Sequence, residues 1–137
     1  MTYLLDTPVV SEPTKSRPND GVLDWLAAHS RDCCISVITL GEVQRGIYGQ
    51  RDERRRIRLD AWLRSGLLGT LDVLPLDAAI ALVWGRLAGE SAIAGRTLPI
   101  LDSLIAATAL VHNLTVVTRN VDDFDACGVN TLNPWSS

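Results

Sequence analysis

Four carboxylate residues stand next to short apolar segments and could together bind a metal ion. They are Asp6 in YLLDTP, Glu42 in SVITLGEV, Asp102 in LPILDSLIAA and Asp123 in TVVTRNVDDF. If the apolar segments are neighbouring parallel strands, these acids meet at one end of the sheet. A cluster of like charges needs a compensating cation, and Mg²⁺ and Mn²⁺ prefer such hard oxygen ligands. We therefore expect a divalent metal site that activates water and stabilises a leaving phosphate oxygen.

Each acid also has a structural explanation, because acids are common near helix starts. Thr39 and Glu42 have the spacing of a capping box, and Asn120 and Asp123 share that spacing. Asp6 could cap the turn into a first helix. These explanations remain open for the single residues.

Asp102 is the strongest functional candidate. The segment from Leu101 to Val111 is apolar on nearly all sides, which predicts a buried helix. An unpaired ionised carboxylate in such surroundings is costly. The closest basic residue in sequence is Arg96, so no obvious partner is near.

Short β-branched strands alternate with helices along the chain, which favours a parallel sheet covered on both faces. We expect strands at 3–6, 33–38, 71–74, 114–118 and 129–132. We expect helices at 20–29, 39–49, 52–64, 77–93, 101–111 and 121–125. Residues 11–20 are the most loop-like stretch, and no linker or repeat divides the chain.

The composition is that of one globular domain of 137 residues. The net charge of −3 argues against a protein that coats nucleic acid by charge alone, but not against a nucleic acid substrate. The three cysteines lack zinc-site spacing and are expected to be buried free thiols. No signal peptide or membrane-spanning segment is evident, so we expect a cytoplasmic protein without a membrane partner.

An arginine-rich stretch carries the main basic character of the chain. It contains Arg51, Arg54, Arg55, Arg56 and Arg58. Such a run is commonly a solvated helix face. The alternative is a track for RNA phosphates that leads to the acids, with Arg54, Arg55 and Arg56 as the contacts.

Four segments resemble PIN domains, in particular the VapC-type toxins of bacterial toxin–antitoxin pairs. They are LLDTPVVSE, SVITLGEVQRGI, GRTLPILDSLIAATALVHNLTVVTRNVDDF and GVNTLNPW. The resemblance covers essentially all of residues 1–137 and implies a single PIN domain. It implies a three-layer α/β/α fold with a four- or five-stranded parallel sheet between helices. The implied activity is Mg²⁺- or Mn²⁺-dependent endoribonuclease cleavage of RNA by a toxin.

The resemblance also implies roles for particular residues. The residues that it marks as catalytic are Asp6, Glu42, Asp102, Asp123 and Asn120, of which Asp6, Asp102 and Asp123 would hold the metal. Whether Asn120, Asp122 or Asp123 completes the site stays open.

The implied partners are RNA and a small antitoxin that blocks the acidic pocket. A homodimer is implied as the core unit, with a higher hetero-oligomer when the antitoxin binds. Apolar side chains in 22–25 and 46–62 could receive an antitoxin helix.

One departure from the family pattern concerns Pro8. The family usually has DTN in the first motif, where this chain has Asp6-Thr7-Pro8. Proline is tolerated at the first helical position, with Thr7 as the expected cap. Because Pro8 replaces the asparagine of the family pattern, the polar side chain usual beside the first carboxylate is missing. This keeps an alternative open, namely a catalytically weak or inactive PIN-like domain that binds RNA or protein.

Overall fold

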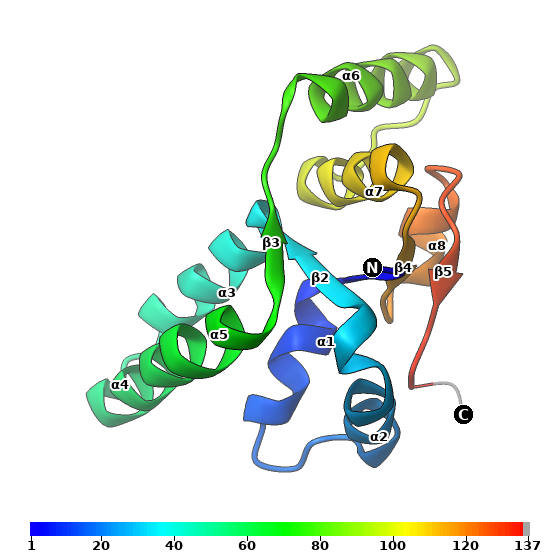
Figure 1. Ribbon diagram of the computed structural model, residues 1–137. Helices are drawn as coiled ribbons and strands as arrows, with labels where there is room; N and C mark the ends of the chain where they lie inside the picture. The colour runs from blue at the N-terminus through cyan, green and yellow to red at the C-terminus, as the bar shows by residue number, and fades with distance from the viewer. Residues whose placement is uncertain (136–137) are drawn as a thin grey trace.

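A parallel β-sheet lies between two layers of helices (Figure 1). The computed structural model describes residues 1–135, and residues 136 and 137 lie outside the described range. Within that range the sheet has five strands, in the spatial order β3-β2-β1-β4-β5, with every neighbouring pair parallel. The strands are β1 (Tyr3–Leu5), β2 (Cys33–Ser36), β3 (Asp72–Leu74), β4 (Thr115–Val117) and β5 (Thr131–Leu132). The expected three-layer α/β/α architecture is confirmed.

The connections between strands are helical. The helices are α1 (Thr7–Ser11), α2 (Asp20–His29), α3 (Val37–Tyr48), α4 (Glu53–Ala61), α5 (Leu68–Thr70), α6 (Ala78–Ile93), α7 (Ile100–His112) and α8 (Val121–Asp125). Short turns of 3₁₀-helix form η1 (Glu12–Thr14) and η2 (Ser30–Asp32), and a π-helical segment forms η3 (Trp62–Leu67).

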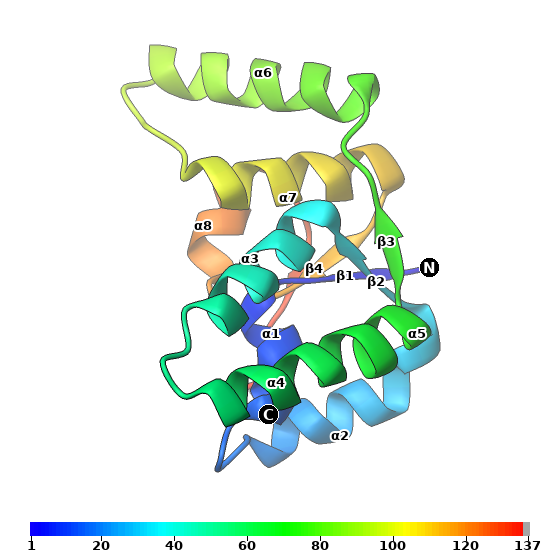
Figure 2. The same cartoon turned by 90° about the vertical axis from the view of Figure 1, so that its left-hand side faces the viewer.

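Buried side chains cover both faces of the sheet. Leu4 and Val116 pack in a cluster with Ile105 of α7. Leu5 and Val117 point to the opposite face, where the cluster includes side chains of α1, α2 and α3. Figure 2 shows α6 and α7 on one side of the strands and α1, α2 and α4 on the other. Because both faces are covered, the strands are apolar without the alternation of a half-exposed sheet.

The strand order places a topological switch point between β1 and β4. The chain builds β1, β2 and β3 outward in one direction and then returns to add β4 and β5 on the other side. In open parallel sheets, a crevice forms outside the carboxyl ends of the strands at such a point. The residues that directly follow β1 and β4 therefore lie at the natural binding position of this fold.

The predicted second strand, 33–38, is two residues too long. Ser36 ends β2, and its Oγ accepts a hydrogen bond from the amide of Ile38 at 3.0 Å. This cap begins α3 at Val37. Continuous apolar character does not show where a buried strand gives way to a buried helix.

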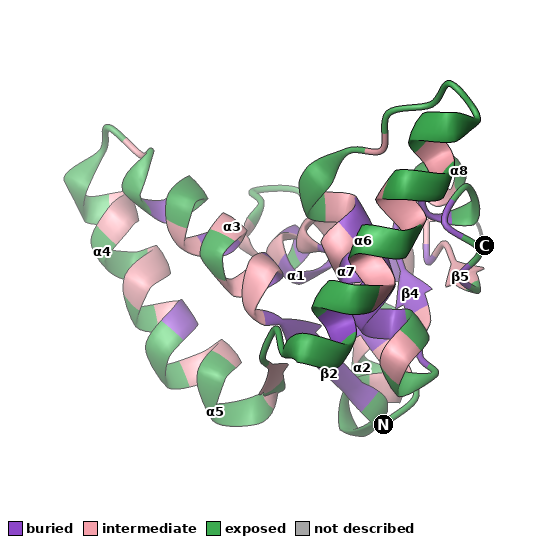
Figure 3. Cartoon of the chain, turned by 90° about the horizontal axis from the view of Figure 1, so that it is seen from above, coloured by how far each residue is buried: buried purple, intermediate pink, exposed green. Residues whose placement is uncertain are grey.

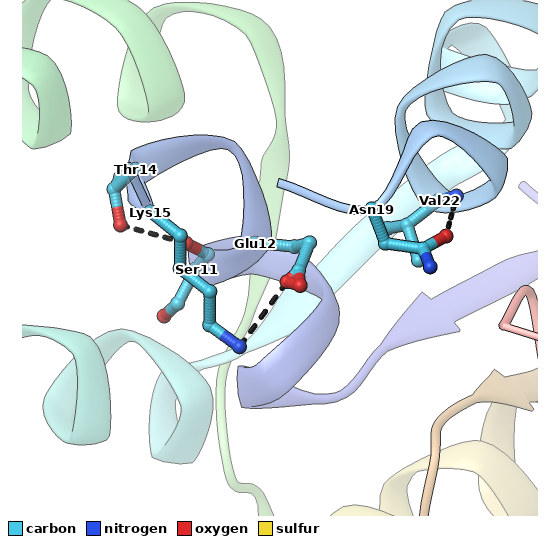
Figure 4. Close-up of polar contacts among 6 residues, drawn as sticks. All are labelled: Ser11, Glu12, Thr14, Lys15, Asn19 and Val22. Atoms are coloured by element: carbon cyan, nitrogen blue, oxygen red, sulfur yellow. Dashed lines mark hydrogen bonds and ion pairs between the residues drawn. The ribbon is translucent and has the colours of Figure 1, made fainter. Parts of the chain in front are cut away.

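Residues 11–20, predicted as the most loop-like stretch, contain the helical turn η1. Glu12 is only 3% exposed, and its Oε2 lies 3.2 Å from Nζ of Lys15. The side chain of Asn19 then accepts from the amide of Val22 at 3.1 Å and begins α2 (Figure 4). Local polar contacts therefore order a segment whose prolines suggested an irregular loop.

The predicted helix at 52–64 is split. α4 ends at Ala61 and continues as the π-helical η3, which leads through α5 to β3. Within residues 1–135 no helix is long and apolar enough to cross a membrane.

Candidate active site

Asp6 lies directly after β1 and is 2% exposed. Its Oδ1 accepts from the amide of Thr7 at 2.9 Å, which caps α1. Its Oδ2 accepts from the hydroxyl of Thr118 at 2.8 Å. The cap of α1 is therefore Asp6, and the expectation that Thr7 would serve was wrong. Pro8 occupies the first turn without disturbing these contacts, because the amide that it lacks needs no partner there.

Thr118 joins the loop after β4 to Asp6. It is fully buried, and while its hydroxyl donates to Asp6, its Oγ1 accepts from the amide of Asn120 at 2.9 Å. One side chain thus sets the position of the first acid relative to the segment that carries Asn120 and Asp123.

Glu42 is joined to the segment after Asp6 by a hydrogen bond with Thr7. The hydroxyl of Thr7 donates to Oε1 of Glu42 at 2.7 Å. Because α3 begins at Val37, Glu42 lies in the second turn of this helix, on the face toward α1. The capping-box explanation for Thr39 and Glu42 was wrong, since Ser36 caps the helix and Thr39 is buried inside it.

Asp102 stands in the first turn of α7, and the neighbouring Ser103 anchors that turn. The Ser103 hydroxyl donates to the carbonyl of Ile100 at 2.8 Å and accepts from the indole Nε1 of Trp84 at 2.9 Å. The prediction of a buried helix from Leu101 to Val111 was right for its middle, where residues 105–109 are buried, and wrong for its ends. Asp102 is only partly buried, and Leu101 and Leu110 are 36% and 38% exposed.

Asp123 and Asp122 differ in whether their charges affect the pKa values of the other acids. Both are exposed on the short helix α8. The charge of Asp123 contributes to the raised pKa values of Asp6 and Asp102, whereas Asp122 contributes to neither. The Asn120 side chain makes no capping hydrogen bond, so the capping explanation for Asn120 and Asp123 was also wrong.

The four acids interact electrostatically. Burial raises the pKa of Asp6, and the charges of Glu42 and Asp123 add to this, while hydrogen bonds from Thr118 and Thr7 act in the opposite direction. Burial, followed by the charges of Asp6, Asp123 and Glu42, raises the pKa of Asp102 to about 6. Within residues 1–135, no lysine or arginine forms an ion pair with any of these four carboxylates. The cluster therefore carries unbalanced negative charge.

This donor set fits a hard divalent cation, because it offers several carboxylate oxygens, and among the described residues none of them is paired with a basic side chain. In the part of the chain that the structure describes, no three His, Cys, Asp or Glu side chains are already arranged to hold an ion. The fit is thus one of charge and ligand chemistry.

Among the three predicted RNA-contact arginines, the structure singles out Arg55. Its Nε donates to Oε1 of Gln50 at 3.2 Å, and it lines a cavity of about 210 Å³ together with Thr7 and Glu42. Arg54 is exposed outside this cavity. Arg56 is also outside this cavity, and its guanidinium lies 3.9 Å from the carboxylate of Glu53.

An apolar hollow of about 300 Å³ lies on the α2 side of the sheet. Its lining includes Val10, Leu26, Trp62 and Leu67. The predicted docking segments are thus only partly available, since Val22 is fully buried in the core.

Sequence reasoning named all four acids of the cluster but missed several of its neighbours. Arg119 and Asn133 line a second cavity beside Asp123, and Trp84 supports the start of α7. Arg119 directly precedes Asn120 in the chain, so its position just after a predicted strand could have identified it as a neighbour of the acids. The position of Asn133 depends on β5 and had no such signal.

The fold and this arrangement of acids define a class of protein, and comparison with known families agrees. The model of the PIN domain family matches residues 3–129. The chain belongs to the PIN domain family, as its sequence motifs indicated.

Relatives of similar length are known from several bacteria. The chain is 36% identical to the plasmid stability protein StbB of Pseudomonas syringae pv. tomato, with 98% of this chain and 99% of the relative covered. It is 33% identical to toxin FitB of Neisseria gonorrhoeae, with 96% and 97% covered. It is also 33% identical to the VapC ribonuclease Y4jK of Sinorhizobium fredii, with 96% of both chains covered.

Solved structures share the fold over almost all of the chain. The structure of FitAcB from Neisseria gonorrhoeae matches with a TM-score of 0.94 at 32% identity, covering 99% of this chain and 100% of the other. A toxin–antitoxin complex from Klebsiella pneumoniae matches with a TM-score of 0.75 at 26% identity, covering 99% and 100%.

Proposed function

We propose that this protein is a divalent-metal-dependent endoribonuclease that acts as the toxin of a toxin–antitoxin pair. The observation that carries the proposal is the electrostatic coupling of Asp6, Glu42, Asp102 and Asp123 near the switch point of the sheet, where within residues 1–135 none of the four forms an ion pair with a lysine or arginine. The names of the relatives, a toxin and a VapC ribonuclease, support the same reading.

Asp6, Asp102 and Asp123 would hold Mg²⁺ or Mn²⁺, and Glu42 would stand beside them. When bound, such an ion lowers the pKa of water and balances charge on phosphate oxygens. Thr118 and Thr7 keep the Asp6 carboxylate oriented by donating to it. Asn120 lines the second cavity together with Asp123, where its side-chain amide would contact substrate.

The test is cleavage of a structured RNA by the purified protein with Mg²⁺, with Mn²⁺ and with EDTA. We expect cleavage with metal only, and a loss of about 100-fold or more in Asp6→Asn and Asp102→Asn, because each change removes a charged ligand. Asp24→Asn, on the exposed face of α2, is the matched control and should cleave normally. Unchanged cleavage in both site variants would remove the assignment.

The same experiment addresses the alternative of a PIN-like domain that binds without cutting. Pro8 is the observation that favours this alternative, because the asparagine side chain usual at this position in the family is missing. The intact contacts of Asp6 and Glu42 around Pro8 favour the enzyme instead. RNA binding with no cleavage under any metal would support the alternative.

We propose two protein partners as well. A small antitoxin would insert a basic side chain among the four acids and place apolar side chains in the hollow lined by Trp62 and Leu67. A second copy would cover the apolar side chains exposed on α6 and α7, of which Leu82 and Ile93 are 77% and 91% exposed. Figure 3 shows much of α6 in the green of exposed residues. The Klebsiella complex, described as toxin–antitoxin, supports the first of these.

A further inference from the structure

A second polar cavity adjoins the acids on the side of β5. It has a volume of about 350 Å³ and is lined by Arg119, Asn120, Val121, Asp122, Asp123 and Asn133. Asn120 and Asp123 belong to the proposed metal site. The proposed function gives no role to Arg119, Asp122 or Asn133.

Arg119 is held in place although it is exposed. Its guanidinium carbon lies 4.4 Å from the centre of the Trp135 ring, in cation–π geometry. Trp135 packs against the core, and its amide donates to Oδ1 of Asn133 at 2.9 Å. This turn fixes the ring that supports the guanidinium. Within residues 1–135 Arg119 forms no ion pair, so its donors remain free for a ligand.

The charge of the cavity favours a neutral group over a phosphate. Arg119 contributes one positive charge, and Asp122 and Asp123 contribute two negative charges. Once a metal engages Asp123, the charges of Arg119 and Asp122 balance. The volume lies at the low end of small-molecule sites, which span roughly 300–1,000 Å³, and suits one nucleoside.

We propose that this cavity binds one unpaired base of the RNA strand beside the scissile phosphate. The base stacks on the Arg119 guanidinium, and its edge is bonded by the Asp122 carboxylate and the Asn133 amide group. Arginine planes and amide groups are common partners of unstacked RNA bases. We expect guanine to be preferred, because its two adjacent N–H donors match a carboxylate. This inference rests on the proposed ribonuclease function and deepens it by placing a specificity site.

The first test is sequencing of the ends produced from a randomised RNA pool. Wild-type protein should show a guanine preference at one fixed position next to the cut. Arg119→Ala and Asn133→Asp should reduce that preference about tenfold, the loss of one good base contact. Asn133→Asp keeps the oxygen that binds the Trp135 amide, so a loss of preference there reports the lost amide donors together with the added negative charge, and not a disordered turn. Arg31→Ala, exposed on η2, carries the same charge change as Arg119→Ala and should match the wild type.

The second test does not depend on cleavage. Titration of the full chain with GMP or UMP, followed by NMR of the Trp135 indole and the Asn133 amide, should show tighter binding of GMP and about tenfold weaker binding in Arg119→Ala. Nucleotide binding without any ribonuclease activity would sink the proposed function and leave this site standing. Cleavage with the same end preference in both cavity variants, or the absence of GMP binding, would overturn the site.

Discussion

Single hydroxyl groups decide how the acids of this protein are presented. Asp6 is the most buried of the four, yet both of its oxygens accept hydrogen bonds from neighbours. These bonds partly offset the burial that raises its pKa. Thr118 is central, because it donates to Asp6 and accepts from the chain after β4.

Replacing Thr118 with Val should therefore weaken both the fold and the metal site. The change leaves the Asn120 amide without its partner and raises the pKa of Asp6 further, at a cost of about 1–3 kcal/mol in the free energy of unfolding. Calorimetric titration at neutral pH should show weaker Mn²⁺ binding. Thr108→Val is the matched control, because Thr108 is equally buried but donates to the Leu104 carbonyl within α7. Equal metal affinity in the two variants would contradict the role given to Thr118.

Asp102 predicts a pH-dependent stability. Its pKa is raised from 3.8 to about 6, so the folded state holds this proton more tightly than the unfolded state does. The resulting stabilisation is fully present below pH 3.8 and is lost as the pH rises through about 6. In EDTA, Asp102→Asn should therefore match the wild type near pH 3.8 and exceed it by about 1 kcal/mol above pH 6, a figure reduced for the partial exposure of the side chain.

Denaturant unfolding of both proteins between pH 4 and pH 8 measures this difference. A difference in the free energy of unfolding that stays constant across that range would show that folding does not raise the pKa of Asp102. Added Mn²⁺ should stabilise the wild type above pH 6 and leave Asp102→Asn nearly unchanged.

At the scale of the elements, three of the four acids lie at or near the N-terminus of a helix. Asp6 caps α1, Asp102 lies in the first turn of α7, and Asp123 lies in the short α8. Glu42 differs, because it stands one turn into α3 and approaches the others through Thr7. α4 adds basic residues to the rim, but only Arg55 faces the cavity that holds Thr7 and Glu42.

Arg55→Ala should accordingly weaken RNA binding more than Arg54→Ala. Removing one phosphate contact lowers the slope of log K against log salt concentration by about 0.7 for a single strand. Fluorescence anisotropy in the Asp102→Asn background, at several salt concentrations, measures both effects without cleavage. Arg54→Ala is the matched control on the same helix. Equal effects from the two changes would indicate a solvated basic face and not a directed contact.

At the scale of the whole molecule, two apolar surfaces lie on different layers. The hollow that includes Trp62 and Leu67 adjoins α2, whereas Leu82 lies on the outer helix α6. We expect from this placement that the proposed antitoxin and a second copy of the chain bind without competing.

Leu67→Glu should weaken binding of a co-encoded antitoxin at least tenfold and leave the mass of the free protein unchanged, because it places a charge in an apolar hollow. Leu82→Glu should do the opposite, lowering the mass of the free protein from dimer to monomer without affecting the antitoxin. Calorimetry and light scattering separate the two. A monomeric wild type would end the dimer proposal, and the absence of binding by any co-encoded partner would end the toxin proposal.

The sequence by itself determined the order of the strands and of the longer helices, the parallel sheet and the family. Apolar strands without alternation require cover on both faces, and the motifs around the four acids were specific enough to indicate a PIN domain. Such features depend on residues close together in the chain, and periodicity therefore reveals them.

Only the tertiary structure decided how the acids are held and which neighbours they have. The bonds from Thr118 to Asp6 and from Thr7 to Glu42 join residues 112 and 35 positions apart. The sequence also ranked Asp102 as the buried acid, but burial depends on what packs against a helix, and α7 leaves its first turn open while the switch point encloses Asp6. Long-range packing sets solvation and hydrogen bonding, and these two effects make four similar carboxylates chemically different.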